Sequence, residues 1–149
     1  MTDVFEAATG DGPAELLADR NRAAQVRTAY EGLLQIRRLT GAAPAEWELR
    51  QVVRAVALAL EAGGLPPSAT DAEGARTATG YRVRTADRAG AVCVDWLGPP
   101  GSGAAQEEEQ RLSQCARVLT SAGWEALLYK GPRNRRFLEV EPPMAPPGG

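Results

Sequence analysis

The spacing of apolar residues along this chain changes its period near residue 80. Before this point they recur every three or four residues, as at Val26, Tyr30 and Leu33, whereas after it they alternate with polar residues, as at Tyr81 and Val83. A period of three to four predicts amphipathic helices, and alternation predicts strands with one buried face. We therefore predict an α+β fold, in which an N-terminal antiparallel helical hairpin is followed by a ββαββ unit with an antiparallel sheet.

The helical hairpin is predicted over residues 13–63. Pro13 suits the first position of a helix that runs to Leu39, and Thr40-Gly41 ends it. The same pattern begins again at Pro44 and ends at Gly63-Gly64. Because few residues separate the two helices, we expect them to pack antiparallel. Residues 1–12 contain few large apolar side chains, which predicts a disordered start.

The ββαββ unit is predicted over residues 80–141, after a linker over 64–79 that contains Pro66-Pro67. Its first strand pair turns at 87–90, its helix spans 104–122, and its second pair turns at 130–134. Residues 142–149 are rich in Pro and Gly, which predicts a disordered tail.

One sheet of four strands would have two faces to cover. The helix over 104–122 covers the first, and the second would carry the side chains of Ala91, Cys93, Leu97 and Phe137. These are too apolar to be left in water, so we expect the N-terminal helical hairpin to cover them. Without that cover, the second face is predicted to bind a partner.

The segment Gly98–Ala105 has the glycine spacing of a phosphate-binding loop, but alanines occupy the positions of its Lys and its Ser or Thr. Glu107, Glu108 and Glu109 then place negative charge where phosphates would lie, so this segment is predicted to be a strand-to-helix connection. The chain has no histidine, and its two cysteines, Cys93 and Cys115, lie on predicted apolar faces. We predict no enzyme activity, no cofactor and no metal.

The overall charge balance does not indicate a class of partner. The net charge of −2 creates no field that would draw the whole chain to nucleic acid or to an anionic membrane. No apolar run has the length of a membrane span and the start lacks a signal layout, so we expect a cytoplasmic protein without membrane contact. Lys130 is the only lysine among 17 basic residues, and this bias is typical of a high-GC bacterium.

Positive charge is concentrated at the second predicted strand pair, in Lys130, Arg133, Arg135 and Arg136. A helix followed by a basic hairpin resembles the end of a winged-helix domain, and this resemblance implies contact with the DNA backbone. The sequence departs from that pattern in the acidic run 107–109, which phosphate would repel. Arg82 and Arg84 share one strand face and form a second basic group. The other interpretation of both groups is a solvated, charged edge that discourages strand pairing.

Trp47, near the start of its helix, and Phe137, on the second sheet face, are the predicted contacts for a protein partner. We therefore predict a non-enzymatic binding or regulatory module that acts through protein–protein contacts. The alternative is a nucleic-acid-binding protein that uses the basic hairpin from Lys130 to Arg136, with Arg82 and Arg84. The sequence leaves the partner and the oligomeric state open.

Overall fold

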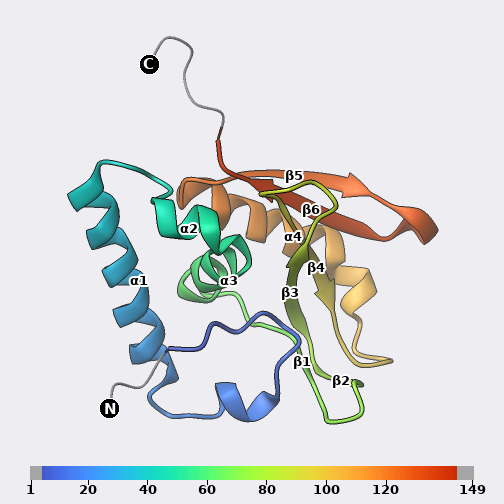
Figure 1. Ribbon diagram of the computed structural model, residues 1–149. Coiled ribbons are helices and arrows are strands. Elements are labelled where there is room, and N and C mark those ends of the chain that lie inside the picture. The colour runs from blue at the N-terminus through green and yellow to red at the C-terminus, as the bar shows by residue number, and fades with distance from the viewer. Residues whose placement is uncertain (1–4, 144–149) are drawn as a thin grey trace.

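The computed structural model describes residues 5–143 and confirms an α+β fold (Figure 1). Its helices are α1 (Arg22–Thr40), α2 (Glu46–Arg50), α3 (Val52–Ala62) and α4 (Ala104–Ser121), with short 3-10 turns at Ala14–Leu17 and Pro132–Asn134. Its strands are β1 (Ala69–Thr70), β2 (Arg76–Ala78), β3 (Gly80–Thr85), β4 (Val92–Leu97), β5 (Glu125–Lys130) and β6 (Arg136–Glu141). The order β3, β4, α4, β5, β6 is that of the predicted ββαββ unit. The strand pair formed by β1 and β2 was not predicted.

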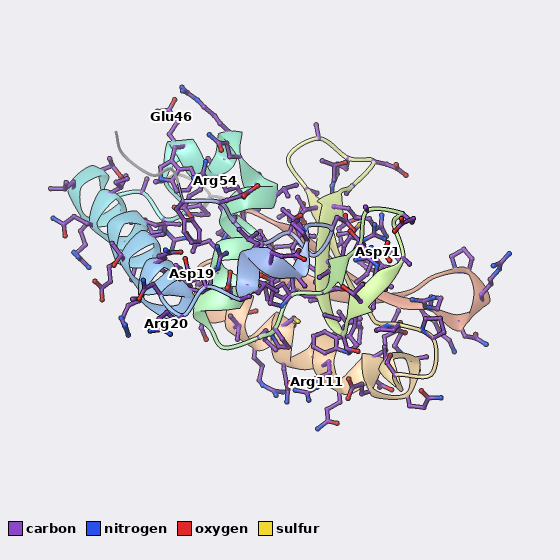
Figure 2. All side chains as sticks on the ribbon, turned by 90° about the horizontal axis from the view of Figure 1, so that it is seen from below. Asp19, Arg20, Glu46, Arg54, Asp71 and Arg111 are labelled. Atoms are coloured by element: carbon purple, nitrogen blue, oxygen red, sulfur yellow. The ribbon has the colours of Figure 1, made fainter. Side chains whose placement is uncertain are left out.

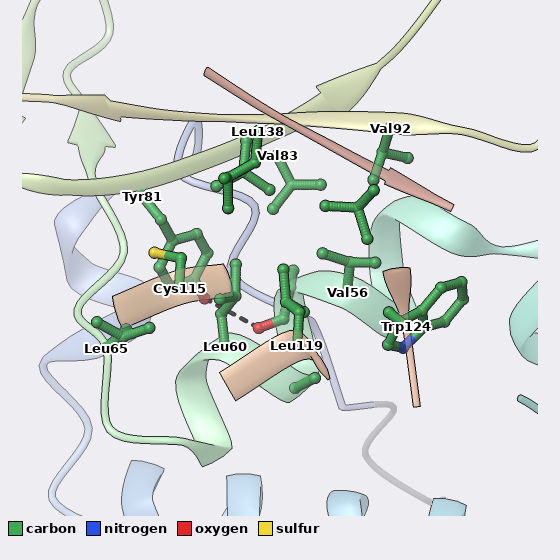
Figure 3. Close-up of a cluster of buried hydrophobic side chains, with 14 of the residues drawn as sticks. Val56, Leu60, Leu65, Tyr81, Val83, Val92, Cys115, Leu119, Trp124 and Leu138 are labelled. Carbon is green, nitrogen blue, oxygen red and sulfur yellow. Dashed lines mark hydrogen bonds between the residues drawn. The ribbon is translucent and has the colours of Figure 1, made fainter. Parts of the chain in front are cut away.

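The main sheet has the strand order β3-β4-β6-β5, with every neighbouring pair antiparallel. Side chains alternate between its two faces, and those of one face, the inner face, are buried. They include Tyr81, Val83, Val94, Trp96 and Leu138, each at most 3% exposed. Figure 3 shows Tyr81, Val83 and Leu138 from the strands meeting Leu119 of α4 and Val56 and Leu60 of α3.

We predicted that the helices would divide between the two faces of the sheet, and they do not. α3 and α4 contact each other and both pack on the inner face, where they share one hydrophobic core. α1 packs on the far side of α3, through Val26, Leu33 and Leu58 (Figure 1). The predicted cover of the second face by the N-terminal helices is therefore wrong. The strongly apolar face of α3 explains the difference, since seven of its eleven residues are buried and need contacts on more than one side.

Tyr81 joins the N-terminal part of the chain to the sheet. It is fully buried, and its hydroxyl lies 2.8 Å from the carbonyl oxygen of Ala8 and 3.1 Å from that of Ala57 in α3. Burial raises the pKa of the Tyr81 phenol far above its ordinary value, so it donates its proton to these carbonyls at any physiological pH. A buried hydroxyl that finds acceptors adds to the stability of this contact instead of opposing it.

Both predicted N-terminal helices are interrupted. The first begins as a 3-10 turn, breaks where the Asp19 carboxylate accepts the backbone N–H of Asn21, and resumes as α1. The second is split at Gln51, whose φ of −135° and ψ of 59° are not helical, into α2 and α3. Each break leaves the apolar period almost unchanged, which is why the spacing alone predicted two continuous helices.

The predicted linker, residues 64–79, is folded against the sheet. Leu65, Ser68 and Ala69 are buried, and Ser68 Oγ donates a hydrogen bond to the carbonyl oxygen of Ala78 across the small β1–β2 sheet. Residues 5–12 of the predicted disordered start run alongside β3, where the Val83 N–H donates to the Thr9 carbonyl at 2.7 Å. The remaining residues of the predicted disordered ends, 1–4 and 144–149, lie outside the described part of the chain.

A buried ion pair holds α1, α2 and the end of α4 together. Glu48 is fully buried and accepts two hydrogen bonds from Arg37, at 2.9 and 2.7 Å, and a third from the Ala45 N–H at 2.8 Å. The remaining Nη1 of Arg37 donates to the carbonyl oxygen of Ala122, the residue that follows α4, at 2.7 Å.

A second bidentate ion pair joins the start of α1 to the end of α3. Arg22 is 7% exposed and donates to both carboxylate oxygens of Glu61, at 2.9 and 2.7 Å. Its guanidinium also lies 4.7 Å from the centre of the Phe5 ring. The two ends of α1 are thus fixed by ion pairs that the apolar pattern does not contain. Within residues 5–143, no helix combines the length and the apolar character that a bilayer span requires.

Candidate functional site

The candidate site is the face of the main sheet that turns away from α3 and α4, here called the outer face. Strand register and alternation place on it Arg82 and Arg84 of β3, Cys93 and Asp95 of β4, Phe137 and Glu139 of β6, and Leu127 and Tyr129 of β5. Both helices that contact the sheet lie on its inner face. The outer face has two halves with different chemistry.

Ion pairs cover the half formed by β3 and β4. Arg82 and Arg84 both donate to Asp95 Oδ2, at 2.9 and 2.8 Å, from the strand opposite. Arg88, in the turn between these strands, bridges Glu139 and Glu141 of β6. The predicted basic group of Arg82 and Arg84 is therefore already paired with a carboxylate, and Cys93, which lies opposite Arg84 in the ladder, is 5% exposed.

The half formed by β5 and β6 carries apolar side chains that are open to water. Leu127 is 51% exposed and Tyr129 is 43% exposed, and the ring of Tyr129 stacks on that of Phe137 with centroids 5.7 Å apart and 22° between planes. The guanidinium of Arg84 lies 5.9 Å from the centre of the Phe137 ring, where the two halves meet. We call Leu127, Tyr129 and Phe137 the outer apolar strip.

The predicted basic hairpin lies at one end of this strip, and the acidic start of α4 neutralises part of it. Glu108 is 2% exposed and accepts the backbone N–H of Arg136 at 2.8 Å and the Nε of Arg135 at 3.3 Å. Glu109 lies 3.5 Å from the guanidinium of Arg136. In the predictions these charges were separate features, and the structure brings them into one cluster.

The tip of the hairpin holds the rest of the predicted cluster. Lys130 and Arg133 are exposed, and neither has a carboxylate within 4 Å among residues 5–143. The backbone of Arg133 and Asn134 is left-handed, with φ values of 61° and 60°, and both side chains are exposed. The start of the preceding helix, α4, lies against the base of the hairpin through Glu108 and Glu109, while Leu112, Cys115 and Leu119 of α4 are fully buried against the sheet.

Trp47, the other predicted protein contact, is half-buried at the start of α2. Its side chain lies against the small cluster of Val26, Leu33 and Leu58, and its Nε1 is buried without a hydrogen-bond partner. Phe137 is the predicted contact that the structure places on the outer face. Leu127 and Tyr129 were missed, although a run of three large apolar residues in one strand, Leu127-Leu128-Tyr129, requires that some of them point away from the core.

The described residues show little that would support acid–base or nucleophilic chemistry. Burial raises the pKa of the Cys93 thiol, and it raises that of Cys115 to about 12, so both thiols are protonated at neutral pH. Within residues 5–143, no three Cys, Asp or Glu side chains are arranged to hold a metal ion. An open hollow of about 790 Å³ lies between residues 5–9 and the junction of α2 and α3, and its Arg54 donates to the Phe5 carbonyl.

Charges of both signs are spread over the remaining surface. Figure 2 shows Glu46 of α2 and Arg111 of α4 on opposite sides of the molecule. The outer apolar strip stands apart from these charged regions, because exposed apolar side chains from neighbouring strands lie together there. Comparison with protein-family models, with curated proteins and with solved structures found no match for this chain.

Proposed function

We propose that this chain is a non-enzymatic, cytoplasmic binding module that recognises another protein through the outer apolar strip. The observation that carries the proposal is the exposure of Leu127 and Tyr129 beside Phe137, on a sheet face that α3 and α4 leave open. Aromatic side chains that are held rigid in the unbound protein contribute strongly to interfaces, because little side-chain entropy is lost on binding. The N-terminal helical hairpin then serves to support the ββαββ unit.

The charge distribution favours a protein over a nucleic acid. Arg82, Arg84, Arg135 and Arg136 each have a carboxylate partner within the chain. A phosphate backbone would have to replace these partners, and the carboxylates left behind would repel it. Lys130 and Arg133 are the members of the predicted basic group that remain available, which is a small number for nucleic-acid contact.

The test compares the capture of partners by the wild-type chain and by variants of the strip. Leu127→Asp and Tyr129→Asp each place a charge on the strip, whereas Leu39→Asp places one on another leucine that is 75% exposed, at the end of α1. We expect the two strip variants to lose a partner protein that the wild type and the Leu39 variant retain in a nuclease-treated extract, and purified partner to reproduce this order. Equal retention by all four chains would reject the strip as the site.

The alternative is tested with the same chains. Retention on a DNA or RNA column that falls steeply with salt, and that is lost in a Lys130→Glu, Arg133→Glu variant, would favour nucleic acid. Partner capture that nuclease treatment abolishes would point the same way. We expect neither result, because the ion pairs described above leave few free positive charges.

A further inference from the structure

The two edges of the main sheet differ in whether their backbone groups are paired. At the β3 edge, Tyr81 donates its N–H to the Pro66 carbonyl and accepts the N–H of Ser68, while Val83 donates to Thr9. At the β5 edge, no strand of residues 5–143 pairs with the side of β5 that faces away from β6. Figure 1 shows β5 along the margin of the molecule. An unpaired edge with apolar side chains is a template for another strand.

The hairpin geometry identifies the backbone groups at this open edge. β5 and β6 pair with Lys130 opposite Arg136, and the Gly131 N–H donates to the Arg135 carbonyl at 2.6 Å. Because hydrogen-bonded and non-hydrogen-bonded pairs alternate along an antiparallel ladder, Tyr129 and Leu127 also direct their backbone groups toward β6. The N–H and carbonyl groups of Ala126, Leu128 and Lys130 therefore point outward from the sheet.

We propose that the partner at this edge is a second copy of the chain, paired antiparallel through β5 about a two-fold axis at Leu128. This register sets Leu128 opposite its own copy and Ala126 opposite Lys130 of the second chain. All three outward-facing residues of each strand are then used, giving about six backbone hydrogen bonds between the copies. The inference rests on the proposed function in one respect, because pairing through β5 would join the outer apolar strips of two copies into one larger surface for a partner.

The side chains of β5 fit the same register. Tyr129 of one copy meets Leu127 of the other on the outer face, in a pair without hydrogen bonds, where side chains lie closest. The two outer apolar strips thus become one continuous surface. Glu125 and Lys130 lie at opposite ends of β5 and on opposite faces of the sheet, and this register sets Glu125 opposite Gly131 and Lys130 opposite Ala126 of the second chain. No like charges stand opposite each other.

Neighbouring registers fit less well. A shift of one residue would place an outer-face side chain opposite an inner-face one, which two-fold symmetry with a continuous sheet does not allow. An axis at Leu127 would set Lys130 opposite Trp124, which precedes β5, and would leave outward backbone groups without a strand residue to pair with. The axis at Leu128 is therefore the one that uses the whole strand.

The experiment measures the mass of the full chain in solution by sedimentation equilibrium, between about 1 and 100 μM, where an association of this kind changes with concentration. We expect a monomer–dimer equilibrium for the wild type. Leu128→Pro removes the outward N–H at the axis but no hydrogen bond of the β5–β6 ladder, and edge strands tolerate proline. It should weaken dimerisation by about tenfold or more.

Two further variants keep the test decisive if proline prevents folding. Leu128→Asp puts like charges opposite each other at the axis and should also give monomers. Leu128→Cys should form a covalent dimer with a short bismaleimide, because the two introduced thiols meet at the axis. Leu39→Cys, which is exposed but lies on α1 outside the proposed contact, should not. The native cysteines are buried and should not react. A monomeric wild type at the highest concentration would overturn the inference, as would dimers that persist in both the Pro and Asp variants.

These outcomes are separable from those of the proposed function. A monomeric wild type whose partner capture still depends on Leu127 and Tyr129 would reject the second copy as the partner and keep the strip as a binding site. A dimer sensitive to Leu128, together with partner capture indifferent to the strip variants, would keep self-association and reject recognition of a different protein.

Discussion

The buried ion pair between Glu48 and Arg37 allows a sharp test of what holds the helices to the sheet. Glu48 is fully buried and accepts three hydrogen bonds, two from Arg37 and one from the Ala45 N–H that starts α2. Arg37 also donates to the Ala122 carbonyl at the end of α4. Removing one partner of such a pair leaves the other charge buried without compensation, which costs about 3 to 5 kcal/mol.

We therefore expect Glu48→Gln and Arg37→Met each to lower the free energy of unfolding by about 3 to 5 kcal/mol. For a chain of this size the corresponding loss in Tm is about 6 to 20 °C. The double variant should lose at least about 2 kcal/mol less than the sum of the two, because neither charge is then left alone. The assay is urea unfolding followed by far-ultraviolet circular dichroism, with the slope m checked for each variant.

The matched control lies two residues away on the same short helix. Glu46 pairs with Arg50 at 2.5 Å, but their side chains are 78% and 73% exposed, so Glu46→Gln should change stability by less than about 0.5 kcal/mol. The reasoning is refuted if Glu48→Gln costs as little as Glu46→Gln. It is also refuted if the effects of Glu48→Gln and Arg37→Met simply add.

Three other predictions follow from single buried groups. Glu108→Ala should lower the free energy of unfolding by about 1 to 3 kcal/mol and speed hydrogen exchange at the start of β6, because Glu108 accepts the N–H of Arg136 there. The exposed Glu109→Ala should change that free energy by less than about 0.5 kcal/mol. Equal effects of the two substitutions would contradict this. Burial raises the pKa of the Cys115 thiol to about 12, so this thiol ionises in the unfolded state at a lower pH than in the folded state. Its contribution to the free energy of unfolding is therefore complete below pH about 8.5 and is lost as the pH rises toward 12. The free energy of unfolding should fall by about 2 kcal/mol between pH 7 and 10 through this group, and less so in Cys115→Ala; an unchanged slope there would argue against it. Gly80→Ala should destabilise the fold by more than about 2 kcal/mol, because its Cβ would lie 2.2 Å from the carbonyl oxygen of Pro66. Gly32→Ala on α1, where the Cβ would meet nothing within 4 Å, should stabilise it by about 0.5 to 1 kcal/mol. Thermal unfolding that ranks the two variants in the other order would be the contrary result.

The sequence predicted the elements better than their arrangement. The alternation in Tyr81–Thr85 and Val92–Leu97 and the helical period in 104–122 are local patterns, and β3, β4 and α4 are found there. The strand order β3-β4-β6-β5 and the face that α3 chooses depend on contacts between segments far apart in the chain. An apolar stripe shows that a face must be covered, but it does not show by which element.

Buried charges were the main failure of the sequence-based predictions. Glu48, Arg22 and Glu108 are buried, although charged residues are normally placed on the surface. Only Glu48 had a local signal, since a Glu three residues after Ala45 is the spacing at which a side chain caps the first N–H of a helix. Arg22 and Glu108 have partners 39 and 27 residues away, which no local pattern reveals.

The outer face was anticipated in part. Phe137 was predicted to lie on the second face of the sheet, as it does, but the residues that extend it, Leu127 and Tyr129, belong to a strand in which each of three consecutive large residues looked equally able to be buried. The strand register separates them by face: Leu127 and Tyr129 lie on the outer face, and Leu128 lies on the inner face, where α4 reaches Ala126 but leaves Leu128 42% exposed. How far α4 extends over β5 is set by tertiary packing, and the sequence pattern of one strand does not predict it.

Pairing of charges within the chain also decides how the outer face can select a partner. A ligand that bound the arginines of β3 would first have to separate them from Asp95, and one that bound the base of the hairpin would have to separate Arg135 and Arg136 from the acidic start of α4. Breaking such pairs offsets much of the electrostatic gain. The outer apolar strip needs no such exchange, because Leu127, Tyr129 and Phe137 carry no charge that an ion pair within residues 5–143 would hold. Binding there should therefore depend on shape and apolar area, and it should weaken little when the salt concentration is raised.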